Sequence, residues 1–102
     1  MIQLIEEKRE ALRDLCRRFH VARLEAFGSA AEGGFDPARS DLDFLVTFDT
    51  SAVMGPSDQY FGLLFALQDL FGRNVDLVCA SAMRNRFFIE EVNRTRQVLY
   101  AA

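Results

Sequence analysis

The feature that most constrains the fold is the segment 41–48, which reads DLDFLVTF. Successive side chains of a β-strand point to opposite faces of a sheet, so one face of this segment carries only apolar residues. The other face begins with Asp41 and Asp43, two residues apart and therefore about 7 Å apart along a strand. Such a strand must cover its apolar face with helices, and it brings two carboxylates to the start of a core strand.

The periodicities of the other segments complete a short series of helices and strands. Apolar residues recur at helical spacing over 2–19 and 59–71, whereas 21–27 and 74–79 are typical of short strands. Further patterns predict a helical turn over 29–33, a helix over 81–95 starting at Ser81, and a terminal strand over 97–100. We expect residues 1–102 to form a single α/β (α+β) domain, a small mixed β-sheet with helices packed on one face.

Composition excludes several classes of protein. The chain has 102 residues and a net charge of −3, which argues against nucleic acid as a direct partner. No run approaches the roughly 18 apolar residues of a membrane span, and the N-terminus is not a signal peptide, so we expect a cytoplasmic protein. Cys16 and Cys79 lack metal-like spacing and are expected to be buried thiols in a reducing compartment. The single histidine, His20, is expected to be structural or exposed.

The segment 74–79, NVDLVC, carries a third aspartate in the same phase as the first two. If its strand lies beside that of 41–48, Asp76 joins Asp41 and Asp43 in one acidic pocket. Carboxylates this close repel one another unless a cation lies between them, and Mg²⁺ prefers oxygen ligands. Two such ions about 4 Å apart are the usual arrangement for nucleotidyl transfer. The alternative is a set of solvated acids that blunt a sheet edge.

A Gly-Ser pair follows the strand predicted over 21–27. Gly28 permits a tight turn and a close approach by a ligand. Ser29 and Glu32 fit a capping box, which predicts the start of a helical turn. The two interpretations are compatible, because the free amides of a helix start suit a triphosphate.

The ordered set of strand, Gly-Ser turn, loop, Asp-x-Asp strand, helix and third aspartate resembles the nucleotidyltransferase fold of the DNA polymerase beta superfamily. Within it the chain is similar to the minimal nucleotidyltransferases (MNT). The matching segments are FGS at 27–29, FDPARSDLDF at 35–44, FGRNVDLV at 71–78 and RNRFF at 84–88. The resemblance therefore extends over nearly the whole chain.

The resemblance implies a role for each residue of the set. Gly28 and Ser29 would contact the nucleotide phosphates. Asp41 and Asp43 would bind Mg²⁺, with two ions expected. Asp76 would be the third metal ligand and the group nearest the incoming hydroxyl, so the three aspartates are the candidate catalytic residues.

The resemblance also implies an activity and a partner. The expected enzyme is a nucleotidyltransferase that transfers AMP from ATP to a hydroxyl. Many MNT proteins are antitoxins paired with HEPN ribonuclease toxins, and some adenylylate a tyrosine of the toxin, so we expect a HEPN-type partner. The alternative is a catalytically weak domain of the same fold that neutralises a partner by contact alone.

Two positions depart from the family pattern. Eleven residues separate Ser29 from Asp41, whereas many members have ten. Glu32 occupies a position where many members carry an arginine that can meet phosphate. Arg39, beside the strand with the metal ligands, is the candidate replacement in the nucleotide site, with Arg84 as the other possibility. Either arginine could instead be an exposed surface residue.

The helix predicted over 59–71 carries more apolar side chains than one core-facing stripe needs. Phe61 and Phe65 are the surplus. They are either deeply buried or part of an interface, and we favour an interface with a partner or with a second copy of the chain, because so small a domain has little interior.

Overall fold

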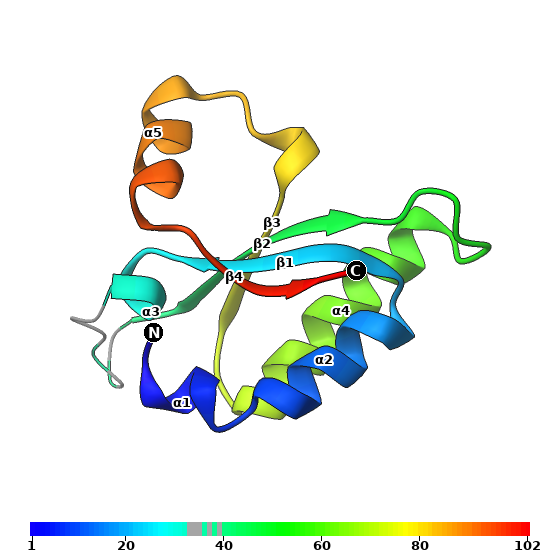
Figure 1. Cartoon of the computed structure of the whole chain (residues 1–102), viewed down its shortest axis with the longest axis horizontal. Coiled ribbons are helices and arrows are strands. Elements are labelled where there is room, and N and C mark those ends of the chain that lie inside the picture. Colours follow the sequence, from blue (N-terminus) through cyan, green and yellow to red (C-terminus); the bar gives the residue numbers. More distant parts are fainter. Residues whose placement is uncertain (33–35, 37, 39) are drawn as a thin grey trace.

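The computed structural model describes residues 1–32, 36, 38 and 40–102 (Figure 1). Within these residues the strands form a four-stranded sheet in the order β3-β2-β1-β4. β2 pairs with β3 in parallel, whereas β1 is antiparallel to both β2 and β4. The predicted mixed sheet is therefore confirmed. The elements are α1 (Gln3–Glu6), α2 (Arg9–Arg18), β1 (Val21–Phe27), α3 (Ser29–Glu32), β2 (Leu42–Phe48), α4 (Pro56–Phe71), β3 (Val75–Cys79), the 3₁₀ turn η1 (Ala80–Ala82), α5 (Arg86–Thr95) and β4 (Gln97–Ala101).

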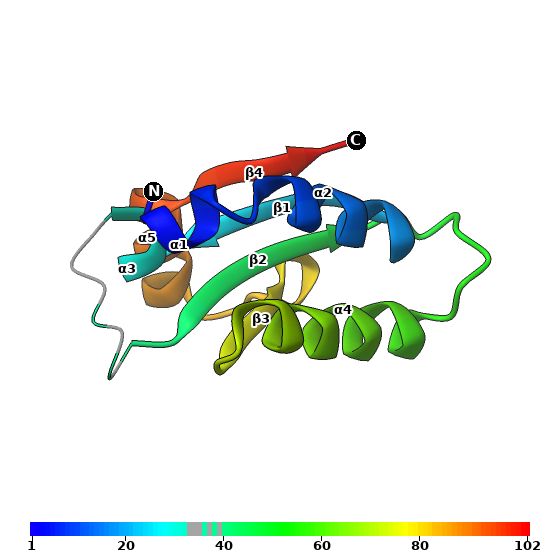
Figure 2. The same ribbon diagram turned by 90° about the horizontal axis from the view of Figure 1, so that it is seen from below.

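Helices lie on both faces of this sheet, as Figures 1 and 2 show. α2 and α4 cover the face that carries the buried side chains of Leu42, Phe44 and Val46, as the alternation in this segment predicts. α5 is the exception to the predicted single helical layer. Its Val92 packs against Phe27 and Leu45 on the opposite face, because these two apolar side chains also need to be removed from water.

A glycine lets α2 and α4 approach each other closely. A Cβ atom at Gly62 in α4 would clash with Cε1 of Phe19, the C-cap residue of α2. The ring of Phe19 is buried in the main core. Any larger side chain at Gly62 would therefore have to push this ring or the two helices apart.

The helices predicted over 2–19 and 81–95 differ from the structure, and the helix predicted over 59–71 begins earlier, at Pro56. The helix expected over 2–19 is divided into α1 and α2, because Lys8 leaves the helical conformation with φ −107° and ψ 13°. The helix expected to start at Ser81 begins instead at Arg86. Its cap is Asn85, whose Oδ1 accepts the backbone N–H groups of Phe87 at 2.9 Å and Phe88 at 3.2 Å. A side-chain oxygen at this position satisfies amides that the helix itself leaves free.

A buried ion pair joins Arg96, the residue between α5 and β4, to the inner strand β1. Glu25 is only 2% exposed, and Arg96 donates to both of its carboxylate oxygens, at 3.0 Å and 2.6 Å. Arg23 donates a third, longer bond of 3.4 Å. These arginines hold the pKa of Glu25 below its ordinary value, with the hydrogen bond from Arg96 as the largest cause. The pair therefore fixes the α5–β4 junction to the sheet.

The two cysteines are free thiols. Burial raises the pKa of the Cys16 thiol to about 12, so this side chain stays protonated and behaves as an apolar core residue. Cys79, at the end of β3, is half-buried. In the part of the chain that the structure describes, helices long and apolar enough to cross a bilayer are absent.

Candidate functional site

Two of the three candidate aspartates lie side by side in the sheet. β2 and β3 are neighbours, and their register pairs Asp43 with Asp76. Neighbouring strands lie about 4.8 Å apart, so the two side chains start from adjacent positions. Leu77, the next residue of β3, is buried in the core on the α4 side, so Asp76 points to the opposite face. Asp41 lies two residues before Asp43, just ahead of β2, and is exposed.

The negative charges of Asp41 and Asp76 act on Asp43. The pKa of Asp43 is raised from 3.8 to about 6, first by burial and then by the negative charges of Asp76 and Asp41. Each contribution opposes ionisation of Asp43. Across the described residues, no three Asp, Glu, His or Cys side chains form a preassembled metal-binding group. The aspartates are therefore an electrostatically coupled set whose side chains would have to move closer together to share a metal ion.

This set of donors fits a divalent cation. It offers carboxylate oxygens only, which is the ligand type that Mg²⁺ takes in proteins. A cation among the three acids would also relieve the repulsion that raises the pKa of Asp43. The residues that could hold the ion are Asp41, Asp43 and Asp76.

The Gly28–Ser29 turn lies directly against this acidic set. Phe27, the last residue of β1, pairs with Asp43 in the sheet register. Gly28 then adopts φ +66°, and a Cβ atom there would lie 2.9 Å from Oδ2 of Asp43. Only glycine combines this left-handed conformation with so close an approach to a carboxylate. The predicted helical turn follows as α3, whose Ala31 and Glu32 amides donate to the Gly28 carbonyl at 3.1 Å and 3.2 Å.

Residues at the α5–β4 junction form hydrogen bonds to this turn, and the sequence did not predict them. The N–H of Gly28 donates to Oγ1 of Thr95 at 2.9 Å, and Nε2 of Gln97 donates to the carbonyl of Ala31 at 3.2 Å. The Gly28 amide is thus already engaged within the protein. The local sequence gives no sign of these bonds, because their partners are more than sixty residues apart along the chain.

The arginine beside the turn is also not one that we predicted. Arg39 lies outside the described residues. Arg84 donates to the carbonyls of Ser81 at 2.8 Å and Met83 at 2.9 Å, in and just after the η1 segment. Instead Arg94 of α5 reaches α3, where its Nη1 lies 2.7 Å from Oε1 of Glu32.

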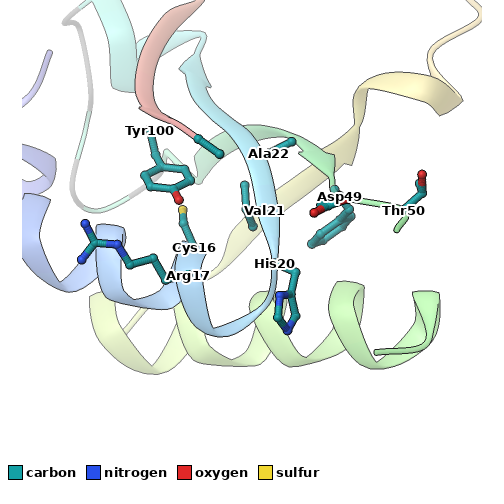
Figure 3. Close-up of a pocket in the computed structure, with 10 residues that line it drawn as sticks. Cys16, Arg17, His20, Val21, Ala22, Asp49, Thr50 and Tyr100 are labelled. Carbon is teal, nitrogen blue, oxygen red and sulfur yellow. The ribbon is translucent and has the colours of Figure 1, made fainter. Parts of the chain in front are cut away.

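A separate pocket lies at the other end of the sheet (Figure 3). It has a volume of about 490 Å³, and residues from the end of α2, the start of β1 and the end of β2 line it, among them Cys16, His20 and Asp49. His20 has φ +56°, and its carbonyl accepts the N–H of Asp49 at 2.8 Å and Nε2 of Gln59 at 3.5 Å. The histidine is exposed and shapes the turn into β1, as expected for a structural residue.

Two phenylalanines of α4 form an exposed apolar patch. Phe61 is 51% exposed and Phe65 is 61% exposed, and their ring centroids lie 6.1 Å apart. The prediction that these two side chains exceed the needs of the core is therefore confirmed. A third ring, that of Tyr60, meets Phe61 edge-on, while its hydroxyl donates to the carbonyl of Leu77 at 2.6 Å.

Comparison with known proteins identifies the family. Residues 8–100 match the family described as the nucleotidyltransferase domain. A solved structure described as a candidate minimal nucleotidyltransferase is 33% identical, with a TM-score of 0.75, and the similarity covers 94% of this chain and 95% of that one. No curated protein sequence matches significantly.

Two further solved structures are similar in fold at low identity. One is a toxin–antitoxin structure with AMP-PNP, at 19% identity and a TM-score of 0.70, covering 92% of this chain and 73% of that one. The other contains the MNT antitoxin with a tri-AMPylated HEPN toxin of Shewanella oneidensis, at 16% identity and a TM-score of 0.64, covering 95% and 72%. The family match, the similar solved structures and the Gly-Ser turn beside paired aspartates agree, and the chain belongs to the nucleotidyltransferase domain family of the DNA polymerase beta superfamily.

Proposed function

We propose that this protein is a Mg²⁺-dependent nucleotidyltransferase that moves AMP from ATP to a hydroxyl group of a partner protein. The observation that carries the proposal is the placement of Asp43 and Asp76 at paired positions of parallel strands, directly beside the Gly28–Ser29 turn. A turn that can receive phosphates and an oxygen-only donor set that can hold Mg²⁺ are thereby adjacent.

Asp41, Asp43 and Asp76 would hold the Mg²⁺, with two ions expected. Bound Mg²⁺ neutralises phosphate charge and lowers the pKa of an attacking hydroxyl. Ser29, at the first position of α3, would contact the phosphates through its hydroxyl and amide. Gly28 would contribute the space and the backbone conformation, because its own amide is bound by Thr95.

The transfer is an in-line displacement at the α-phosphorus of ATP. The acceptor oxygen forms a bond to this phosphorus, and the bond from the phosphorus to the bridging oxygen of the β-phosphate breaks. Pyrophosphate leaves with the electron pair. Asp76, the acid on the strand farthest from the Gly28–Ser29 turn, would accept the proton of the hydroxyl.

The acceptor would be a HEPN-type toxin, with the present chain acting as its antitoxin. The similarity in fold to an MNT antitoxin in complex with an AMPylated HEPN toxin supports this partner. The exposed pair Phe61 and Phe65 supports a docking surface on α4 for a partner or for a second copy of the chain.

A second candidate function is neutralisation by binding alone. Glu32 places a carboxylate at the end of the turn that would receive phosphates, which favours weak nucleotide binding. The double variant Asp41→Asn/Asp43→Asn separates the two functions. Neutralisation of the partner toxin would survive it if contact suffices, and would be lost if transfer is required.

The direct experiment uses ATP labelled at the α-phosphate, Mg²⁺ and the HEPN protein encoded nearest to this chain. We expect label on the HEPN protein with the wild type and none with Asp76→Asn, whose side chain has nearly the same shape. Glu10→Gln, which removes an exposed acid on α2 outside the proposed site and docking surface, is the control and should transfer normally. Absence of transfer by the wild type, under conditions where the two proteins bind, would refute the enzymatic proposal.

A further inference from the structure

Arg94 forms an ion pair that joins the end of α5 to the turn of the proposed nucleotide site. Its Nη1 lies 2.7 Å from Oε1 of Glu32, and its other nitrogens bind the carboxylate of Glu91, one helical turn earlier in α5. The pKa of Arg94 is raised by Glu91 and then by Glu32, so the pairing favours the charged guanidinium. The bond to Glu32 connects residues that are 62 positions apart. It is therefore a tertiary contact and not a local pair within one helix.

Neighbouring contacts fix the backbone from which Arg94 projects. Thr95 receives the N–H of Gly28, and Gln97 binds the carbonyl of Ala31. Thr95 is 4% exposed, and its hydroxyl also donates to the carbonyl of Glu91 at 3.2 Å. The segment carrying Arg94 is thus attached to both ends of the turn, which limits how far the guanidinium can move away from Glu32.

The carboxylate of Glu32 would repel a polyanionic ligand if Arg94 did not pair with it. Glu32 closes α3, three residues after Ser29, and Asp43 already lies against Gly28. An unpaired carboxylate at Glu32 would add to the negative charge that a triphosphate meets at this turn. The guanidinium of Arg94, which Glu32 shares with Glu91, offsets part of that repulsion.

We propose that Arg94 is a positioning residue that compensates the charge of Glu32, so that the Gly28–Glu32 turn can accept a nucleoside triphosphate. The proposal rests on the proposed function and names how that same site tolerates an acid. Arg94 acts here through Glu32 and not by direct contact with the phosphates. Loss of Arg94 should therefore matter only while Glu32 is charged.

The test measures binding of a fluorescent ATP analogue, MANT-ATP, with Mg²⁺ by fluorescence anisotropy. Arg94→Gln should weaken binding about fivefold, and the loss should shrink at high salt. Arg94→Lys keeps the charge and should stay within about twofold of the wild type. The double variant Glu32→Gln/Arg94→Gln should bind as well as Glu32→Gln alone. Arg86→Gln, which removes another exposed arginine of α5, is the control and should leave binding unchanged.

Each other outcome overturns a defined part of the reasoning. If the double variant binds as weakly as Arg94→Gln, Arg94 does not act through Glu32 and this inference fails. If Arg94→Gln binds like the wild type, the pair has no role in nucleotide binding. If the wild type itself does not bind MANT-ATP with Mg²⁺, the proposed function fails as well. Thermal unfolding of each variant shows whether the fold is retained, as expected for a side chain that is 57% exposed.

Discussion

Replacing Asp43 by asparagine should raise the unfolding free energy at neutral pH, because it removes an electrostatic penalty that the folded protein carries there. Asp43 is ionised in the unfolded chain above its ordinary pKa of 3.8, whereas its pKa in the folded protein is about 6. Between these values the folded state holds a proton that the unfolded state has lost. Stability therefore falls as the pH rises through this window, and the full penalty is present above it. The asparagine side chain of the variant carries no charge at any pH and escapes the penalty.

The structure sets the size of the effect. A difference of about 2 pK units corresponds to about 3 kcal/mol, at 1.36 kcal/mol per unit. Asp43 is only partly buried, so solvent screening reduces this figure to about 1–2 kcal/mol. Relative to the wild type, Asp43→Asn should gain that amount of stability between about pH 4 and about pH 7.5.

The assay is urea unfolding of both proteins across this pH range, with and without Mg²⁺. Without Mg²⁺ the difference in unfolding free energy should grow with pH in favour of the variant. With Mg²⁺ at neutral pH the wild type should be stabilised, by about 2.7 kcal/mol at one hundred times the dissociation constant, and the variant much less. Asp69→Asn controls for the loss of one exposed negative charge on α4.

A difference that stays constant with pH would refute the view that Asp43 lies in a crowded acidic set. A Mg²⁺ response that is equal in the wild type and Asp43→Asn would show that the ion binds elsewhere.

Three further predictions test the frame around the site. Gly28→Ala should lower the unfolding free energy by about 1–2 kcal/mol, because alanine resists a positive φ, and should weaken binding of MANT-ATP with Mg²⁺, because the new methyl group meets Oδ2 of Asp43 at 2.9 Å. Urea unfolding and fluorescence anisotropy measure the two effects, and an unchanged variant would contradict a left-handed turn at this position. Glu25→Gln should lower the unfolding free energy by about 3 kcal/mol near neutral pH. Because the folded pKa of Glu25 is depressed, this loss should be complete above its ordinary pKa of 4.5 and vanish as the pH falls through the folded value; a loss independent of pH in urea unfolding would exclude the ion pair as its source. The double variant Phe61→Ser/Phe65→Ser should change the unfolding free energy by only about 0.5 kcal/mol while abolishing capture of the HEPN partner; retained capture would remove α4 from the interface.

The sequence predicted the parts of this site that depend on strand periodicity. The alternation in 41–48 placed the apolar side chains of β2 under the helices, and the phase of Asp76 anticipated its pairing with Asp43. Both follow from the two-residue repeat of a strand, which is a local property. Gly28 likewise predicted a tight turn, and its positive φ in the structure is a conformation that favours glycine.

The contacts that hold the turn could not be predicted in this way. The bonds from Gly28 to Thr95 and from Glu32 to Arg94 join residues that are distant in the chain, and neither pair shares a local pattern. The position of α5 could not be predicted from a local pattern either. It depends on packing against Phe27 and Leu45, which lie on the sheet face that also carries the aspartates. From the sequence we expected an arginine close to β2 to compensate Glu32, whereas in the fold Arg94 of α5 pairs with Glu32.

The most direct test of the central claim is a crystal structure with Mg²⁺ and a non-hydrolysable ATP analogue. We expect metal ions bound by Asp41, Asp43 and Asp76 together, with the phosphates against Ser29. Metal bound without Asp76, or phosphates seated away from this turn, would contradict the claim.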